Sequence, residues 1–186
     1  MIMSDPNNIN LSLMKGKKGV IMGVANDHSI AWGIAQSLSA AGAELAFSYQ
    51  SETLKKRVEP LAKMLGSDLI YPCDVESSED IEIFFNSIQN KWESIDFLVH
   101  AIAFSDKSEL KGPYYNTTKE NFIKTMLVSC FSFTEVVKEA QKIMISGGSI
   151  ITLTFDGANR VMPNYNVMGI AKAGLESSVR YLASDF

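Results

Sequence analysis

Short apolar runs alternate with longer amphipathic stretches along almost the whole chain. The apolar runs predict buried strands at residues 19–23, 44–49, 68–71, 97–101 and 149–154. The longer stretches predict helices at residues 29–41, 52–65, 78–92, 118–145 and 164–183. Ser29 suits the N-cap of the first helix and Gly42 its end.

Strands that alternate with helices indicate βαβ units, and therefore a parallel sheet covered by helices on both faces. Right-handed crossovers leave few arrangements. We expect an α/β protein with a doubly wound, Rossmann-type parallel sheet in the order 3-2-1-4-5. The 186 residues contain no repeat and no low-complexity linker, which indicates a single domain.

The composition narrows the class of protein. Apolar residues make up 46% of the chain and charged residues 20%, as in globular proteins, and the net charge of -4 argues against a nucleic-acid partner. Cys73 and Cys130 lack metal-ligand spacing and are interpreted as reduced structural thiols, and His28 and His100 are too far apart to suggest a metal site.

The sequence does not predict a membrane protein. No run approaches the roughly 20 apolar residues that a membrane span needs. Residues 1–18 are polar and lack the apolar core of a secretory signal, so we expect a cytoplasmic protein.

The turn after the first predicted strand is a candidate phosphate site. It begins at Gly23 and leads into a helix, where free backbone N–H groups and the helix dipole favour an anion. Only Gly23 and Gly33 remain of the usual glycine pattern, so a tight turn without a ligand is the alternative.

Polar residues also follow the second and third predicted strands. Gln50 stands where NAD sites often place an acid on the ribose 2′-hydroxyl. Lys55, Lys56 and Arg57 come next and either attract a 2′-phosphate or form a solvated helix face. Asp74 either accepts a hydrogen bond from an adenine amine or caps the following helix.

Tyr165 and Lys172 are seven residues apart, so they share one face of the last predicted helix. Two turns correspond to a rise of about 10.5 Å, too far for direct contact. A lysine can reach back toward the start of its helix, which leaves space for a ligand between the two groups. The alternative is a chance pair of surface residues.

These residues carry a family resemblance. Residues 163–172, PNYNVMGIAK, resemble the signature of enoyl-[acyl-carrier-protein] reductases in the short-chain dehydrogenase/reductase superfamily. Four earlier segments of the chain, in the same order as in that family, are also similar to it, namely residues 23–35, 42–50, 73–75 and 99–104. Ordinary superfamily members place a tyrosine four residues before the lysine, where this chain has Met168, and this difference argues against a carbonyl reductase.

The resemblance implies a function. It is the NADH-dependent reduction of the 2,3-double bond of trans-2-enoyl thioesters on acyl carrier protein, in bacterial fatty-acid elongation. It also implies homotetramers, in which the helices at residues 118–145 and 164–183 pair between subunits. Because Gln50 is uncharged, NADPH remains open as the cofactor in place of NADH.

The resemblance further implies residue roles. Lys172 would bind the nicotinamide ribose hydroxyls, Tyr165 would donate to the thioester carbonyl, and Ser105 would also contact the substrate. The other implied cofactor residues are Gly23, Ser29 and Ile30 at the pyrophosphate, Gln50, Asp74 and Val75 at the adenosine, and Ile102 in the wall of the site.

The sequence departs from the family pattern in two ways. Phe155 replaces a second tyrosine, so the aromatic ring is kept and the hydroxyl is lost. If that hydroxyl only packs near the cofactor, its loss has a small effect. If it delivers a proton or holds a water, its loss lowers turnover. The chain also stops at Phe186, whereas relatives continue through two strands and a substrate lid. We therefore expect a truncated chain with residues 150–155 at the sheet edge, prone to aggregation or pairing. A catalytically impaired nucleotide-binding or assembly module is the alternative.

Overall fold

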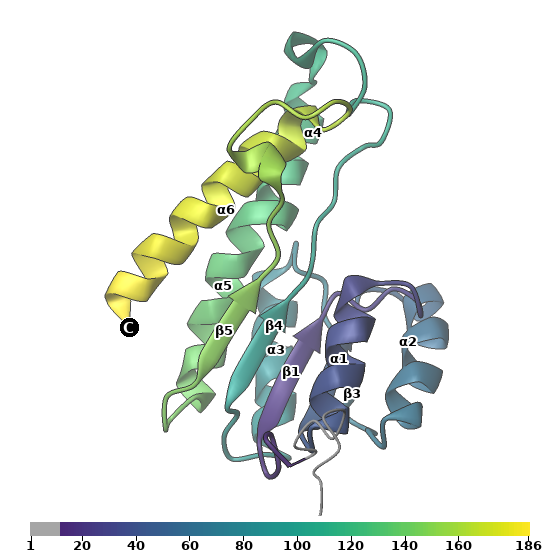
Figure 1. Cartoon of the computed structure of the whole chain (residues 1–186), viewed down its shortest axis with the longest axis vertical. Helices are drawn as coiled ribbons and strands as arrows, with labels where there is room; N and C mark the ends of the chain where they lie inside the picture. The colour runs from purple at the N-terminus through teal and green to yellow at the C-terminus, as the bar shows by residue number, and fades with distance from the viewer. Residues whose placement is uncertain (1–11) are drawn as a thin grey trace, which may run out of the picture.

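The computed structural model describes residues 12–186, and its centre is a five-stranded parallel sheet in the order β3-β2-β1-β4-β5 (Figure 1). Every neighbouring pair of strands is parallel. The predicted fold class and strand order are therefore confirmed. The strands are β1 (Lys18–Met22), β2 (Glu44–Tyr49), β3 (Ile70–Pro72), β4 (Phe97–His100) and β5 (Ser149–Thr152).

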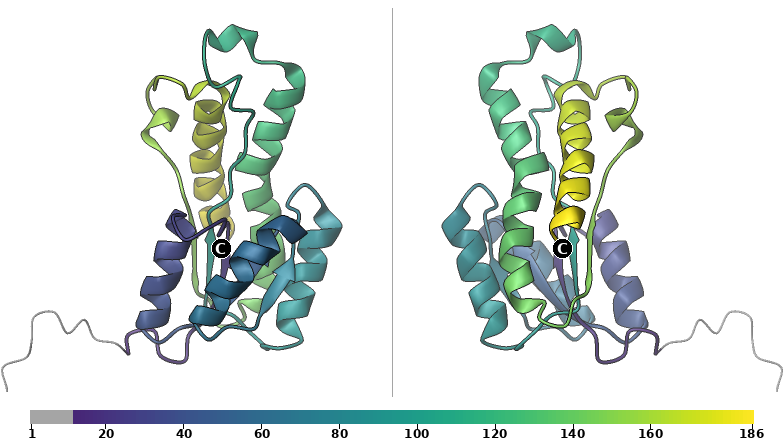
Figure 2. Two further views of the ribbon diagram at one scale, coloured as in Figure 1. Left: turned by 90° about the vertical axis from the view of Figure 1, so that its right-hand side faces the viewer. Right: turned by 90° about the vertical axis from the view of Figure 1, so that its left-hand side faces the viewer.

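Helices cover both faces of the sheet (Figures 1 and 2). The α-helices are α1 (Ile30–Ala40), α2 (Glu52–Met64), α3 (Ser78–Gln89), α4 (Lys119–Met126), α5 (Ser132–Ala140) and α6 (Asn166–Asp185). Single turns of 3-10 helix lie at η1 (Tyr114–Asn116), η3 (Gln141–Ile143) and η4 (Asp156–Ala158). The long helix predicted at residues 118–145 is interrupted by a π-helical turn, η2 (Leu127–Phe131), which separates α4 from α5.

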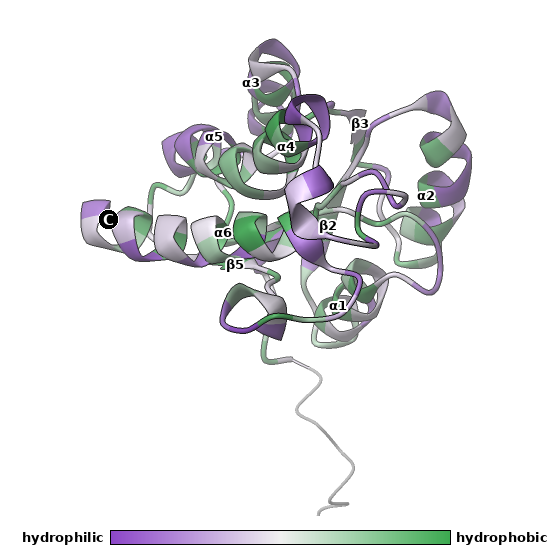
Figure 3. Cartoon of the chain, turned by 90° about the horizontal axis from the view of Figure 1, so that it is seen from above, coloured by the Kyte–Doolittle hydropathy of each residue, from purple (hydrophilic) through white to green (hydrophobic). Residues whose placement is uncertain are grey.

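Two apolar clusters hold these layers together. On one face of the sheet, α1 and α2 pack against Ile21, Phe47 and Val99. On the other face, α3, α5 and α6 pack against Val20 and Leu98. Because successive side chains of a strand point to opposite faces, a strand buried on both faces is apolar throughout, as the sequence pattern predicted. Figure 3 shows that the outer side of α2 is hydrophilic.

Parallel strands bring their carboxyl ends to one edge of the sheet. The segments that follow β4 and β5 rise above this edge, together with η1 and the start of α4 (Figure 1). Ligands of open α/β sheets bind in the crevice outside the carboxyl ends of the strands. We therefore expect a ligand site at this edge of the sheet.

The predicted N-cap position of Ser29 is confirmed, whereas a capping role for Asp74 is wrong. Ser29 lies at the N-cap of α1, but its hydroxyl donates to the Asn26 carbonyl at 2.7 Å and accepts no hydrogen bond from the helix. Asp74 does not cap α3, because Ser77 occupies the N-cap and its hydroxyl accepts from the Asp80 N–H at 3.1 Å.

The two cysteines are free and buried, which confirms their interpretation as structural thiols. Burial raises the pKa of the Cys73 thiol to about 12, so this thiol stays protonated at neutral pH. The polar segment at residues 1–18, on which the expected cellular location rests, lies mostly outside the described residues.

Candidate functional site

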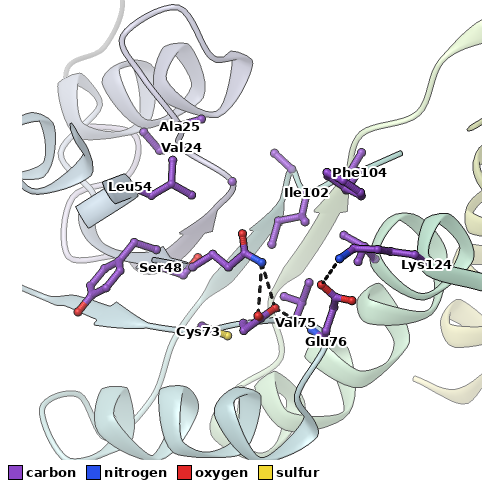
Figure 4. Close-up of a pocket in the computed structure, with 17 residues that line it drawn as sticks. Val24, Ala25, Ser48, Leu54, Cys73, Val75, Glu76, Ile102, Phe104 and Lys124 are labelled. Atoms are coloured by element: carbon purple, nitrogen blue, oxygen red, sulfur yellow. Dashed lines mark hydrogen bonds and ion pairs between the residues drawn. The ribbon is translucent and has the colours of Figure 1, made fainter. Parts of the chain in front are cut away.

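A cavity of about 240 Å³ opens at the carboxyl edge of the sheet (Figure 4). The segments that follow β1, β2, β3 and β4 supply its walls. Five residues predicted to bind a cofactor line it together, namely Gly23, Gln50, Asp74, Val75 and Ile102. The lining does not include the other three, Ser29, Ile30 and Lys172.

Gly23 makes room for the close approach of two segments. Its φ is +102°, and a Cβ atom at this position would lie 2.1 Å from the Ala101 carbonyl oxygen. Only glycine fits, and the turn leads through Ser29 to the start of α1, where Ile30 is 70% exposed. A tight glycine turn before an open helix N-terminus suits a pyrophosphate, so the residues present fit a dinucleotide.

Gln50 and Asp74 interact across the floor of the cavity. The Gln50 side-chain amide nitrogen lies 3.3 Å from both carboxylate oxygens of Asp74. Asp74 also accepts a hydrogen bond from the Glu76 N–H at 3.1 Å. A carboxylate only accepts, so the Gln50 amide must turn its N–H groups toward Asp74. The Gln50 carbonyl oxygen is then left to accept a hydrogen bond from a hydroxyl, whereas the same oxygen would repel a phosphate.

The nearby cations have partners of their own. Lys55 lies 3.8 Å from Glu52 and 5.7 Å from the centre of the Tyr49 ring, which supports the solvated-face interpretation for this lysine. Lys124 pairs with Glu76 at 3.2 Å and lies 5.1 Å from the Phe104 ring (Figure 4). The cavity therefore offers no free ammonium from these two lysines.

Neither Tyr165 nor Lys172 is an exposed surface residue. Tyr165 stands at the N-cap of α6 and is half-buried, and Lys172 is 6% exposed. The Lys172 ammonium reaches back to donate to the Leu153 carbonyl at 2.7 Å, just after β5. Burial lowers the pKa of Lys172. Burial also raises the pKa of Tyr165, so the phenol keeps its proton at neutral pH.

Phe155 and Ser105 occupy different settings. The Phe155 ring is 45% exposed and lies 4.9 Å from the Tyr165 ring, at an angle of 59°. The Ser105 hydroxyl is buried and accepts from the Thr125 hydroxyl at 2.9 Å, with the Asn121 amide oxygen 3.3 Å away. The aromatic wall next to Tyr165 is therefore kept, while the substrate contact expected of Ser105 stays a prediction.

Two residues near the site were not found from the sequence. His100 ends β4 with no exposed surface and contacts the hydroxyls of Thr152 and Ser132. Ser129 accepts from the Phe104 N–H and donates to the Phe104 carbonyl, both at 2.9 Å. The only sequence feature that marks them is a polar residue inside an otherwise apolar segment.

Comparison with known proteins assigns the chain to a family. A family model described as enoyl-(acyl carrier protein) reductase matches residues 23–186. This chain belongs to that family. Enoyl-[acyl-carrier-protein] reductase [NADH] 2 of Rhizobium meliloti (strain 1021) is 61% identical to it over 174 residues, which cover 94% of this chain and 65% of the relative.

Solved enoyl reductases share the fold. The enzyme of Anaplasma phagocytophilum, solved with NAD, has a TM-score of 0.90 and 56% identity over 92% of this chain and 66% of its own. The enzyme of Bacillus cereus, solved with NADP+ and indole naphthyridinone, has a TM-score of 0.91 and 47% identity over 94% of this chain and 68% of its own.

The chain spans just under two thirds of the length of its Rhizobium relative. Within residues 12–186, no helix is long and apolar enough to cross a bilayer. In the same region, no three His, Cys, Asp or Glu side chains form a group that could hold a metal ion.

Proposed function

We propose that this chain is an NADH-dependent enoyl-[acyl-carrier-protein] reductase, which reduces the 2,3-double bond of trans-2-enoyl thioesters in bacterial fatty-acid elongation. The observation that carries the proposal is the pair on α6, with the Lys172 ammonium buried at the end of β5 and Tyr165 two turns earlier. The Rhizobium relative, which is named an enoyl-[acyl-carrier-protein] reductase [NADH], supports the same activity.

Tyr165 and Lys172 have different roles in the reaction. When bound, NADH supplies the hydride that adds to the β-carbon of the enoyl thioester. Negative charge then develops on the thioester oxygen, and the Tyr165 hydroxyl stabilises it by donating a hydrogen bond. Such a donor contributes about 3–4 kcal/mol to lowering the barrier. Lys172 would hold the nicotinamide ribose hydroxyls and add its positive charge. The enolate then takes a proton from water at the α-carbon, which completes the reduction.

The remaining cofactor contacts follow the cavity. Gly23, Ser29 and Ile30 hold the pyrophosphate, and Ile102 lines the site. Gln50, Asp74 and Val75 hold the adenosine half. Because Asp74 turns the Gln50 amide so that its carbonyl oxygen is free, a ribose hydroxyl is accepted there and a 2′-phosphate is disfavoured. This geometry supports NADH over NADPH.

The proposed assembly is a homotetramer that pairs α4–α5 and α6 between subunits in the cytoplasm. These helices leave large apolar side chains exposed, and such patches mark protein contacts. The exposed residues are Phe122, Ile123 and Phe131 on the first segment, and Ile170, Val179 and Tyr181 on α6. Sedimentation equilibrium of the chain checks this; a monomer at all concentrations would contradict it.

The decisive experiment measures NADH consumption with a crotonyl thioester of acyl carrier protein, followed at the nicotinamide absorbance band. We expect turnover by the chain and a fall in kcat of about 100- to 1,000-fold in Tyr165→Phe, because one transition-state donor is lost. Since the phenylalanine ring fills the same space, NADH binding by the variant should be unchanged. No NADH consumption above background would contradict the proposal.

Phe155 favours one other function, a nucleotide-binding or assembly module without turnover. The ring next to Tyr165 has no hydroxyl to give, although it is close enough to contact the same ligand. Calorimetry with NADH and NADPH separates the two functions. NADH binding without turnover supports the module, and binding of neither NADH nor a partner rejects it.

A further inference from the structure

The ring of Tyr165 lies directly against a glycine. Gly157, in the η4 turn after β5, would place a Cβ atom 2.4 Å from Cδ1 and 2.8 Å from Cε1 of Tyr165. The φ of Gly157 lies outside the left-handed region, so an alanine backbone is allowed there. An alanine at this position would therefore displace mainly the Tyr165 ring.

A second glycine allows this contact. A Cβ atom at Gly169, on the first turns of α6, would lie 2.7 Å from the Gly157 carbonyl oxygen and 3.7 Å from Cδ1 of Tyr165. The absence of both side chains lets η4 lie directly on the start of α6. Phe155 completes the surroundings of the ring, with its centroid 4.9 Å from that of Tyr165.

The backbone on either side of Tyr165 is strained. Asn164 has a φ of 59° and Asn166 a φ of 27°, in the left-handed region that non-glycine residues seldom adopt. The Asn166 side-chain amide donates to the carbonyls of Glu109 at 3.0 Å and Gly112 at 3.2 Å. Strain of this kind persists only where the surroundings impose it, and it gathers at functional sites.

We propose that Gly157 is a positioning residue that fixes the orientation of the Tyr165 ring, with Gly169 and Asn166 as the other parts of the same frame. This inference rests on the proposed function, in which Tyr165 donates to the substrate. An oxyanion donor must lie about 2.7–3.1 Å from the developing charge. A misplacement of about 1 Å can cost roughly 100-fold in rate.

The first test follows the ring itself. The whole chain is labelled with ring-¹³C tyrosine, and the Tyr165 resonances are assigned by their loss in Tyr165→Phe. In Gly157→Ala we expect these resonances to shift, because the ring moves relative to the ring current of Phe155. Gly33→Ala is the matched control, since Gly33, like Gly157, lies outside the left-handed region, and no atom lies within 4 Å of its Cβ position, so the change adds a methyl group without touching Tyr165.

The second test follows turnover. Gly157→Ala should lower kcat by about 100-fold, with the dissociation constant for NADH unchanged. In the Tyr165→Phe background the same change should have no further effect on kcat, because Gly157 acts through the lost hydroxyl. A kcat that falls equally in both backgrounds contradicts a positioning role.

The ring measurement needs no turnover, so the two proposals fail separately. An inactive wild-type chain counts against the proposed function alone. Unchanged Tyr165 resonances in folded Gly157→Ala overturn the inference. If that variant does not fold, Asn166→Gly replaces it, because glycine accepts the φ of 27° and the change removes the two side-chain hydrogen bonds. Unchanged resonances there would also overturn the inference.

Discussion

The hydrogen bonds of the buried His100 ring depend on its protonation state. The Ser132 hydroxyl donates its one hydrogen to the Val128 carbonyl at 2.7 Å, so it must accept from Nε2 of His100, 3.0 Å away. Nδ1 then carries no hydrogen and accepts from the Thr152 hydroxyl at 3.2 Å. Burial, and then the charge of Lys172, lower the pKa of His100 to about 3, so the neutral ring holds β4, β5 and α5 together.

This depressed pKa predicts acid sensitivity. Unfolded histidine titrates near 6.5, while folded His100 stays neutral until about pH 3, so the unfolded state binds the extra proton in between. The free energy of unfolding should fall by about 2 kcal/mol between pH 7 and pH 5 through this residue. Urea unfolding at pH 7, 6 and 5 checks this against His100→Gln, whose amide can donate and accept. Equal pH dependence in both proteins would contradict it.

At the scale of elements, the π-turn η2 connects the helix layer to the cavity. Ser129 lies in this turn and pairs with both backbone groups of Phe104, in the segment after β4 that lines the cavity. The hydroxyl thus joins α4–α5 to the carboxyl edge of the sheet. π-Turns inside α-helices often mark functional positions.

Ser129→Ala should therefore lower the free energy of unfolding and weaken NADH binding. The substitution leaves an N–H and a carbonyl without a partner, at a cost of about 1–3 kcal/mol. Ser87→Ala is the control, because the exposed Ser87 hydroxyl only donates back to the Ile83 carbonyl within α3. Urea unfolding and NADH titration of both variants measure the difference. Loss of the same size in the control would reject a special role for Ser129.

The sequence was sufficient for the elements and insufficient for their contacts. Apolar runs located all five strands because each strand contains consecutive apolar residues, and helical spacing located the helices. It could not locate the π-turn, whose position is tied to a bond between Ser129 and Phe104, 25 residues away.

The sequence likewise predicted some candidate site residues but not their contacts. Gln50 and Asp74 were predicted separately from their strand ends, and the structure brings them within hydrogen-bonding distance. The pairing of His100 with Thr152, 52 residues later, and the contact between Ser105 and Thr125 depend on tertiary packing. Local patterns hold no information about such contacts.

For the whole molecule, β5 forms an open edge of the sheet. The strand order places β5 at the edge, as the sequence predicted for residues 150–155, although the strand itself ends at Thr152. Ile151 is 49% exposed, and a groove of about 470 Å³ opens between β5, α5 and α6. Unpaired backbone groups beside apolar side chains favour pairing with another chain.

Ile151→Lys should reduce association of the chain beyond the helix-paired homotetramer, because a charge on an edge strand opposes pairing. Stability should change little, since half of the side chain is already in water. Val161→Lys is the control, as Val161 is 98% exposed in the segment after η4 and lies in no strand. Dynamic light scattering across a concentration series compares the three proteins. Equal association in wild type and Ile151→Lys would show that β5 is not the contact.

The two buried cysteines allow the opening of two regions to be timed separately. Cys73 lines the cavity, while Cys130 lies in η2 and faces Ser178 of α6, with the two side-chain atoms 3.9 Å apart. A thiol reagent can modify either one only after its region opens. A nucleotide bound in the cavity would delay modification of Cys73, whereas a partner that covers α6 would delay Cys130, so one mass-spectrometric time course distinguishes the two kinds of ligand.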